Sequence, residues 1–195
     1  MAKFYAVKIG RKPGIYNSWD ECKMQVDKFK GAVYKSFSNK EDALMFIEEK
    51  KVYFNNGLIA YVDGSYNVKT KEYGFGCVII EGQQVIKEMF GKGNDENYVS
   101  MRNVAGEILG SICAMEYANS NGYKQICIYY DYEGIEKWAN ATWKANKKGT
   151  QEYQKKVAKY RENLEIIFVK VLAHSGDFYN EKADMLAKKA VGING

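Results

Sequence analysis

The chain has 195 residues and a formal net charge of +5, a length that fits one domain of about 140 residues and one small appended unit. No apolar run approaches the roughly 20 residues that a membrane-spanning helix needs, and the amino terminus lacks a hydrophobic signal region, so a soluble, cytoplasmic monomer without membrane contact is expected. The four cysteines have no metal-site spacing, which argues against zinc and favours reduced, buried thiols.

Residues 1–48 are expected to form a small α+β unit that is rich in aromatic residues and lysine. Such a unit is too small to be an enzyme but large enough to bind a ligand. The pattern predicts strands at 4–10 and 32–37, a turn at 10–14 around the only proline, a helix at 19–29 capped by Ser18, and an amphipathic helix at 38–47.

Residues 49–56 are expected to be a short linker that reaches at most roughly 30 Å, and residues 57–195 to be the second domain. The pattern of this domain predicts an α/β fold, with a mixed five-stranded sheet flanked by helices. The second and third strands form a hairpin. The predicted strands are 58–63, 73–80, 84–91, 126–131 and 165–172, and the predicted helices include 103–115, one that begins near Glu133, and 180–190.

Four carboxylates stand at the ends of strands or on the inner side of helices. Asp63 and Asp131 each end an apolar strand, so two neighbouring strands would place them together. Glu107 lies on the flank of an apolar helical stripe, where an acid is costly without a cation. Asp184 is expected in the first turn of the last helix, which Asn180 would cap and where the helix dipole favours an anion.

Each acid taken singly also fits an ordinary structural role, because such aspartates make turns and cap helices. A pair of hard ions such as Mg²⁺, however, needs about four carboxylates from separate segments, so the set predicts a two-metal phosphodiesterase site. The only histidine, His174, lies in a Gly-containing loop before the helix that carries Asp184. A proton shuttle or product-release residue would stand there, and a structural or surface role is the alternative.

Positive charge is concentrated between Lys137 and Arg161, where eight cations accompany a single acid. Trp138, Trp143 and Lys144 lie in this stretch. Basic residues interleaved with aromatic ones suit a strand of nucleic acid. The alternative is a solvated lysine-rich helix with Trp138 in the core.

The segments around the four acids resemble type 1 ribonuclease H, in family order and spacing from about residue 57 to the end. The resemblance implies the ribonuclease H fold and hydrolysis of the RNA strand of RNA/DNA hybrids, which leaves 3′-hydroxyl and 5′-phosphate ends. It implies two Mg²⁺ ions, with Mn²⁺ as a substitute, and a mobile histidine at His174 that helps product leave. The implied metal ligands are Asp63, which both ions share, Glu107, Asp131 and Asp184. The matching segments are Tyr61-Val62-Asp63-Gly64-Ser65, Asn103-Val104-Ala105-Gly106-Glu107, Tyr129-Tyr130-Asp131, 169–177 and 180–187.

The same resemblance implies contacts with the nucleic acid. Asn103 would touch the backbone or groove of the hybrid, and Glu107 a 2′-hydroxyl of the RNA, which separates RNA from DNA. The basic segment with its two tryptophans resembles the family's basic protrusion, which grips the DNA strand. Val104 departs from the pattern, since many relatives have a glutamine there that touches a base.

Residues 1–48 resemble the hybrid-binding domain that precedes the catalytic domain in many cellular type 1 ribonucleases H and that also occurs in caulimovirus viroplasmin. The resemblance implies that Tyr5 and Trp19 stack on sugars of the DNA strand and that Tyr34 and Lys35 contact its backbone. Ser36 stands where a second lysine often follows. The implied partner is RNA/DNA hybrid, with double-stranded RNA as a second partner. The alternative is that Tyr5 and Trp19 are core aromatics.

Two rival functions stay open. The first is a binding protein that keeps the fold without cleaving, which the four intact carboxylates disfavour. The second is a different nuclease of the same superfamily, such as a resolvase or a proofreading exonuclease. The His174 loop and the amino-terminal unit fit that second rival poorly.

Overall fold

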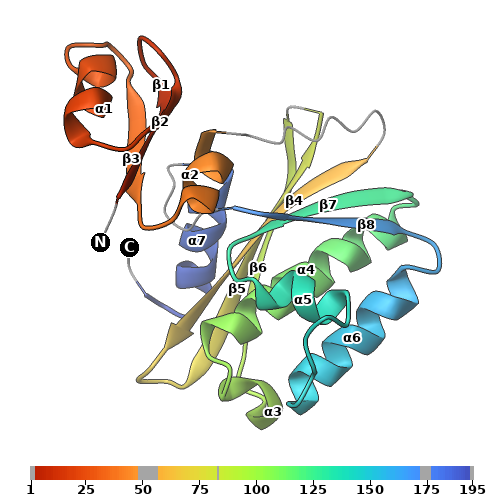
Figure 1. Cartoon of the computed structure of the whole chain (residues 1–195). Coiled ribbons are helices and arrows are strands. Elements are labelled where there is room, and N and C mark those ends of the chain that lie inside the picture. The colour runs from red at the N-terminus through yellow and green to blue at the C-terminus, as the bar shows by residue number, and fades with distance from the viewer. Residues whose placement is uncertain (1–2, 48–56, 83, 172–176, 194–195) are drawn as a thin grey trace. The chain divides into compact units, whose positions relative to one another are not determined.

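The computed structural model describes residues 3–47, 57–82, 84–171 and 177–193 and divides into two compact units (Figure 1). The first unit contains residues 3–47, and the second contains residues 57–170 and 177–193. The predicted linker, 49–56, and His174 lie outside the described residues.

The first unit is a three-stranded antiparallel sheet with a helix against each face, which confirms the predicted small α+β unit. Successive residues of the central strand face opposite helices, because side chains alternate along a strand. Val7 contacts one helix and Ala6 the other. The elements are β1 (Phe4–Ile9), β2 (Gly14–Tyr16), α1 (Trp19–Val26), β3 (Val33–Phe37) and α2 (Lys40–Ile47), and the strand order is β2-β1-β3.

Two local details of the first unit differ from the expectation. The segment after the predicted turn is a short strand, β2, because Gly14 to Tyr16 pair with β1. Helix α1 ends at Val26 rather than near Phe29, since Asp27 has a ψ of 126° and leaves the helix. At its other end the Ser18 cap is confirmed, and Glu21 completes a capping box with it.

The second unit has the predicted mixed five-stranded sheet, and its strand order is β6-β5-β4-β7-β8. Strands β4, β5 and β6 pair antiparallel, whereas β4, β7 and β8 pair parallel. A one-turn helix, α3, precedes α4 and was not predicted. The strands are β4 (Leu58–Asn67), β5 (Glu72–Glu81), β6 (Gln84–Gly93), β7 (Gln125–Tyr130) and β8 (Glu165–Lys170), and the helices are α3 (Glu96–Val99), α4 (Asn103–Ser120), α5 (Gly134–Ala139), α6 (Lys148–Tyr160) and α7 (Phe178–Ala190).

The prediction that Asp63 ends a strand is wrong, because Asp63 lies in the middle of β4. The strand continues to Asn67, since its second half pairs with β5. Only the parallel pairing with β7 stops, at Tyr61 opposite Tyr129. The same register, continued by two residues, sets Asp63 beside Asp131 on one face of the sheet.

Helices α4 and α7 lie against opposite faces of the sheet (Figure 1). A Cβ on Gly64 of β4 would collide with the backbone of α4 at Asn103, and a Cβ on Gly76 of β5 would collide with the backbone of α7 at Ala183. Gly76 pairs with Asp63, the neighbour of Gly64, so the two glycines face opposite sides. Each helix backbone therefore rests directly on the sheet.

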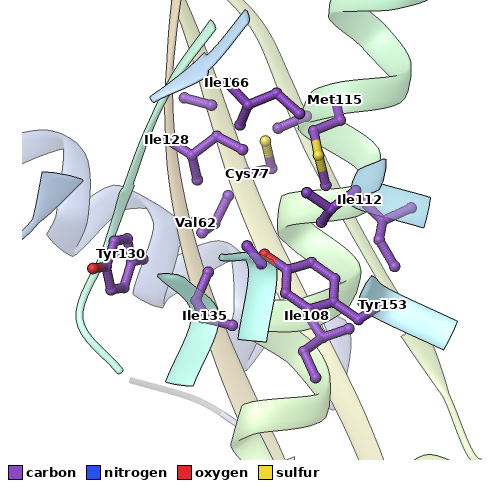
Figure 2. Packing of buried hydrophobic residues seen from close by; sticks show 14 of the residues in the cluster. Val62, Cys77, Ile108, Ile112, Met115, Ile128, Tyr130, Ile135, Tyr153 and Ile166 are labelled. Carbon is purple, nitrogen blue, oxygen red and sulfur yellow. The ribbon is translucent and has the colours of Figure 1, made fainter. Parts of the chain in front are cut away.

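The main core lies between the sheet and helices α4, α5 and α6 (Figure 2). Ile108 and Met115 of α4 are fully buried, as are Val62 of β4, Ile128 of β7 and Tyr153 of α6. Removing such side chains from water drives folding, at about 25 cal/mol per Å² of apolar surface. The apolar strands recognised in the sequence are thus the ones that the helices cover.

The structure also addresses the expectations about the cysteines and about membrane-spanning helices. All four cysteines are free; three of them are buried and Cys113 is half-buried. None of the helices in the described part of the chain combines the length and the apolar character that crossing a bilayer requires.

We expect Gly76→Ala to destabilise the second unit by about 1–3 kcal/mol, the usual cost of overpacking, because the added methyl group would displace the backbone of α7. Urea unfolding measures the change. Gly91→Ala on β6 is the matched control, since its methyl group would meet only the ring of Phe75. Equal stability of the two variants would contradict the close contact between β5 and α7.

Candidate active site and nucleic-acid interface

The structure brings the four predicted carboxylates together where the parallel pairing of β4 and β7 ends. Asp63 lies in β4, Asp131 directly follows β7, and Glu107 and Asp184 come from α4 and α7. Asp63 is close enough to feel the charges of Asp131 and Asp184, and Glu107 feels those of Asp131 and Asp63. Four segments that are far apart in the sequence therefore contribute to one negative cluster.

Glu107 is the most deeply buried of the four, with 1% of its surface exposed. Burial is the main cause that raises its pKa well above the ordinary value, and the charges of Asp131 and Asp63 raise the pKa further. The backbone N–H of Tyr132 donates a 3.2 Å hydrogen bond to Glu107 Oε2 and lowers the pKa in part. The site holds this carboxyl group in place while disfavouring its negative charge.

Asp63 is partly buried, and its pKa is raised to about 7. Burial is the largest cause and the charge of Asp131 the next. The Gly64 N–H donates a 2.6 Å hydrogen bond to Asp63 Oδ1 and lowers the pKa. The charge of Asp184 raises it, and the Lys188 ammonium lowers it. A carboxyl group in this position gains from any cation bound beside it.

The predicted placement of Asp184 in a helical first turn is wrong. Asp177, not Asn180, caps α7 by accepting hydrogen bonds from the Tyr179 and Asn180 N–H groups. Asp184 therefore lies near the middle of α7, where the helix dipole contributes little. Its partner is Lys188, one turn later, at 2.7 Å. The sequence analysis missed this lysine, although the spacing of four residues indicates the pair.

The donor set of the cluster fits a hard divalent cation. Carboxylate oxygens are the ligands that Mg²⁺ and similar ions prefer, and the pKa values of Asp63 and Glu107 are raised first by burial and then by the neighbouring carboxylates. Among the described residues, no three acidic, histidine or cysteine side chains are already spaced as a closed ligand set. The cluster is thus an open arrangement whose mutual repulsion a cation would relieve.

Asn103 is exposed in the first turn of α4, one turn before Glu107. The helix begins without a side-chain cap, and the preceding residue, Arg102, has a φ of 53°. This conformation is uncommon for a residue with a side chain and costs free energy. The surrounding structure therefore holds the start of α4 against a local preference, directly beside the acids.

The basic segment places a row of aromatic rings beside the cluster. Tyr132 lies 5.8 Å from Trp138, and Trp138 lies 6.1 Å from Trp143 between ring centroids. Trp138 packs partly against the core, as the alternative interpretation proposed, whereas Trp143 is exposed. The sequence analysis missed Tyr132. A hollow of about 340 Å³ adjoins these rings and is lined by Ser100, Met101, Val104, Tyr132, Trp138, Lys144, Asn146, Lys147 and Thr150.

The first unit gathers three of its four predicted contact residues on one face. The Trp19 ring lies 5.9 Å from Tyr5 and 5.8 Å from Tyr34 between centroids. Trp19 is 42% exposed and Tyr34 44% exposed. Tyr5 is half-buried and packs against the core of the first unit, so the core-aromatic alternative holds in part for Tyr5 but not for Trp19. Lys35 lies on the opposite face of β3, with its ammonium 5.8 Å from the centroid of the Phe37 ring.

The strand order of the sheet and the carboxylate cluster define the second unit as a nuclease domain of the ribonuclease H fold. Residues 55–192 match the family model described as RNase H, and residues 3–47 match the one described as the ribonuclease H1 N-terminal domain. The chain therefore belongs to the ribonuclease H family, whose members are metal-dependent, hydrolytic endoribonucleases.

Individual relatives agree with this assignment. The chain is 24% identical to human ribonuclease H1 in an alignment that covers 95% of the chain and 88% of the human protein. It is 46% identical to ribonuclease H of Saccharomyces cerevisiae over 61 residues, 31% of the chain but only 18% of the yeast protein. The crystal structure of LC11-RNase H1 in complex with RNA/DNA hybrid matches with a TM-score of 0.57 and 20% identity, and the match covers 69% of the chain and 96% of that protein.

We expect Asp63→Asn to raise the melting temperature of the metal-free protein more at pH 8 than at pH 5. The folded-state pKa of Asp63, about 7, lies above the unfolded value of about 4, so its contribution to stability is lost as pH rises between the two. The asparagine avoids that loss. Thermal unfolding with EDTA measures the effect, and exposed Glu162→Gln is the control. An equal gain at both pH values would contradict the raised pKa.

Proposed function

We propose that this protein is an endonuclease that hydrolyses the RNA strand of RNA/DNA hybrids. The observation that carries the proposal is the convergence of Asp63, Glu107, Asp131 and Asp184 at one site in a domain of the ribonuclease H family. A relative of the same fold has been crystallised with RNA/DNA hybrid, which supports the choice of substrate.

The four carboxylates would hold two Mg²⁺ ions, with Mn²⁺ as a substitute, and Asp63 is central enough to serve both. The bound ions would supply an activated water and stabilise the leaving oxygen and the charge on phosphorus, which yields 3′-hydroxyl and 5′-phosphate ends. Glu107, which accepts a hydrogen bond from the Tyr132 N–H, would contact a 2′-hydroxyl next to the scissile phosphate. His174, outside the described residues, would help the product leave.

We assign hybrid binding to one surface region on each of the two units. In the second unit it comprises Asn103 and the basic segment with Trp138, Trp143 and Lys144. In the first unit it comprises the face with Tyr5, Trp19 and Tyr34, which offers aromatic rings to sugars. Lys35, on the other face of β3, fits this surface less well. Double-stranded RNA is a second proposed partner of the first unit, and we propose a monomer in the cytoplasm, which the free cysteines support.

We expect Asp131→Asn to abolish metal-dependent cleavage of labelled RNA/DNA hybrid, with kcat reduced about 10³-fold or more, while hybrid binding in EDTA stays within a few-fold of wild type. The reason is the loss of a charge beside both Asp63 and Glu107. Glu162→Gln is the matched control.

Duplex DNA and single-stranded RNA are tested as alternative substrates of the wild-type protein. Tight hybrid binding without cleavage by the wild type would favour the binding-protein alternative, and cleavage of duplex DNA would favour another nuclease of the superfamily.

We expect Trp19→Ala to weaken hybrid binding by about fivefold to twentyfold, in the range measured for aromatic stacking on nucleic acid, without lowering kcat at saturating hybrid. Fluorescence anisotropy in EDTA measures the dissociation constant. Met24→Ala on the same helix is the control, because it removes an exposed apolar side chain that is not among the three aromatic residues. Equal affinities of the two variants for hybrid would show that the aromatic face of the first unit does not contribute to hybrid binding.

A further inference from the structure

Two hydroxyl groups lie inside the main core, where most neighbouring side chains are apolar. Ser111 comes three residues after Ile108 and four before Met115, on the inner face of α4, and Tyr153 lies on the inner face of α6. Both side chains are fully buried. Figure 2 shows the Tyr153 ring within the cluster, with its hydroxyl oxygen directed away from α6. Alanine and phenylalanine would fill these positions without the cost of burying a hydroxyl group.

The two hydroxyl groups are neighbours, but neither makes a hydrogen bond of ordinary geometry with another described residue. Burial raises the pKa of Tyr153, whereas the nearby Ser111 hydroxyl group lowers it. The Arg161 guanidinium also lowers this pKa, but its Nη1 and Nη2 donate to Ala139 O and Asn140 Oδ1. Because buried polar groups in proteins are almost always hydrogen-bonded, both hydroxyl groups need a partner between α4 and α6.

This pair of hydroxyl groups lies one helical turn from the most deeply buried acid of the site. Ser111 follows Glu107 by four residues, so the two side chains lie on the same face of α4. The charge of Glu107 also reaches Tyr153 and raises its pKa. A contact that ties Ser111 to α6 therefore also fixes the turn of α4 that carries Glu107.

We propose that Ser111 and Tyr153 bind one internal water molecule, and that this bridge positions Glu107 by fixing the rotation of α4 against α6. A water molecule can donate to one hydroxyl group and accept from the other, and buried waters commonly satisfy such polar groups in protein interiors. Repulsion from Asp131 and Asp63 pushes the Glu107 carboxylate away from the cluster, and the bridge resists this push. The water site stands by itself, whereas its effect on Mg²⁺ binding rests on the proposed function.

A high-resolution crystal structure of the full chain tests the water site. The expected result is one ordered water molecule within hydrogen-bonding distance of both Ser111 Oγ and Tyr153 Oη. A direct hydrogen bond between the two hydroxyl groups, with no water molecule beside them, would overturn the inference.

The positioning role is tested with Tyr153→Phe, Ser111→Ala and the double variant. Each single variant is expected to raise the dissociation constant for Mg²⁺, measured by calorimetry without substrate, about tenfold, as changes behind a metal ligand do. For hybrid cleavage, kcat is expected to fall while KM stays unchanged. The double variant is expected to bind Mg²⁺ no more weakly than the single variants, because both groups act through one bridge. Its melting temperature is expected to exceed theirs, because no hydroxyl group is left without a partner.

Tyr98→Phe is the matched control, because Tyr98 is also a buried tyrosine whose hydroxyl group contacts α6, through a 2.8 Å hydrogen bond to Glu152 Oε2. This variant is expected to have a lower melting temperature and an unchanged affinity for Mg²⁺. An equal loss of Mg²⁺ affinity in Tyr98→Phe would overturn the positioning role, because any loosening of α6 would then have the same effect. A folded Tyr153→Phe variant with wild-type Mg²⁺ affinity would overturn it too. If the wild type binds Mg²⁺ without cleaving hybrid, the proposed function fails, and the calorimetry still decides the positioning role.

Discussion

The fold of the second unit has to offset the repulsion between negatively charged carboxylates that lie close together in a partly buried space. The parallel register of β4 and β7 sets Asp63 and Asp131 side by side, and α4 adds the buried Glu107 to them. Burial makes each charge costly, and proximity makes the set costlier than its members. The hydrogen bonds from Gly64 and Tyr132 offset only part of this cost. The packing of the whole domain must supply the stabilising free energy that offsets the rest of this cost.

The packing that holds the acids together depends on close contact between backbones. Gly64 lets α4 rest on β4, and Gly76 lets α7 rest on β5 from the other side. Both glycines lie within a residue of Asp63 or of its cross-strand partner position. Rigid elements therefore meet at the point where the charges repel, and a methyl group at either glycine would move a carboxylate as well as a helix. Stability and site geometry are set by the same contacts.

The sequence predicted the sheet, both units and the four acids, because those features appear in local periodicity and in residue types. What it could not supply depends on long-range pairing. The sequence pattern of an acid after apolar residues is the same whether the strand ends at the acid or continues beyond it. Only the pairing with β5 shows that β4 continues past Asp63. Asp177 and Asn180 are both good capping residues, and the tertiary position of α7 selects Asp177, which also accepts from the Tyr61 hydroxyl at 3.4 Å. Likewise the position of the partly exposed Tyr132 ring depends on its tertiary contacts with Gly134 and Trp138.

The raised pKa values couple the site to both protons and cations. Near pH 7 the metal-free Asp63 is partly protonated, because its pKa is about 7, and the raised pKa of Glu107 favours its protonated form as well. A cation that needs both carboxylates ionised must displace those protons, so its apparent affinity falls as pH falls. Lys188 acts in the opposite sense, because its ammonium lowers the pKa of Asp63 while pairing with Asp184. The lysine thus partly neutralises the cluster through its ion pair with Asp184, whereas the causes that raise the pKa of Glu107 are burial and the charges of Asp131 and Asp63.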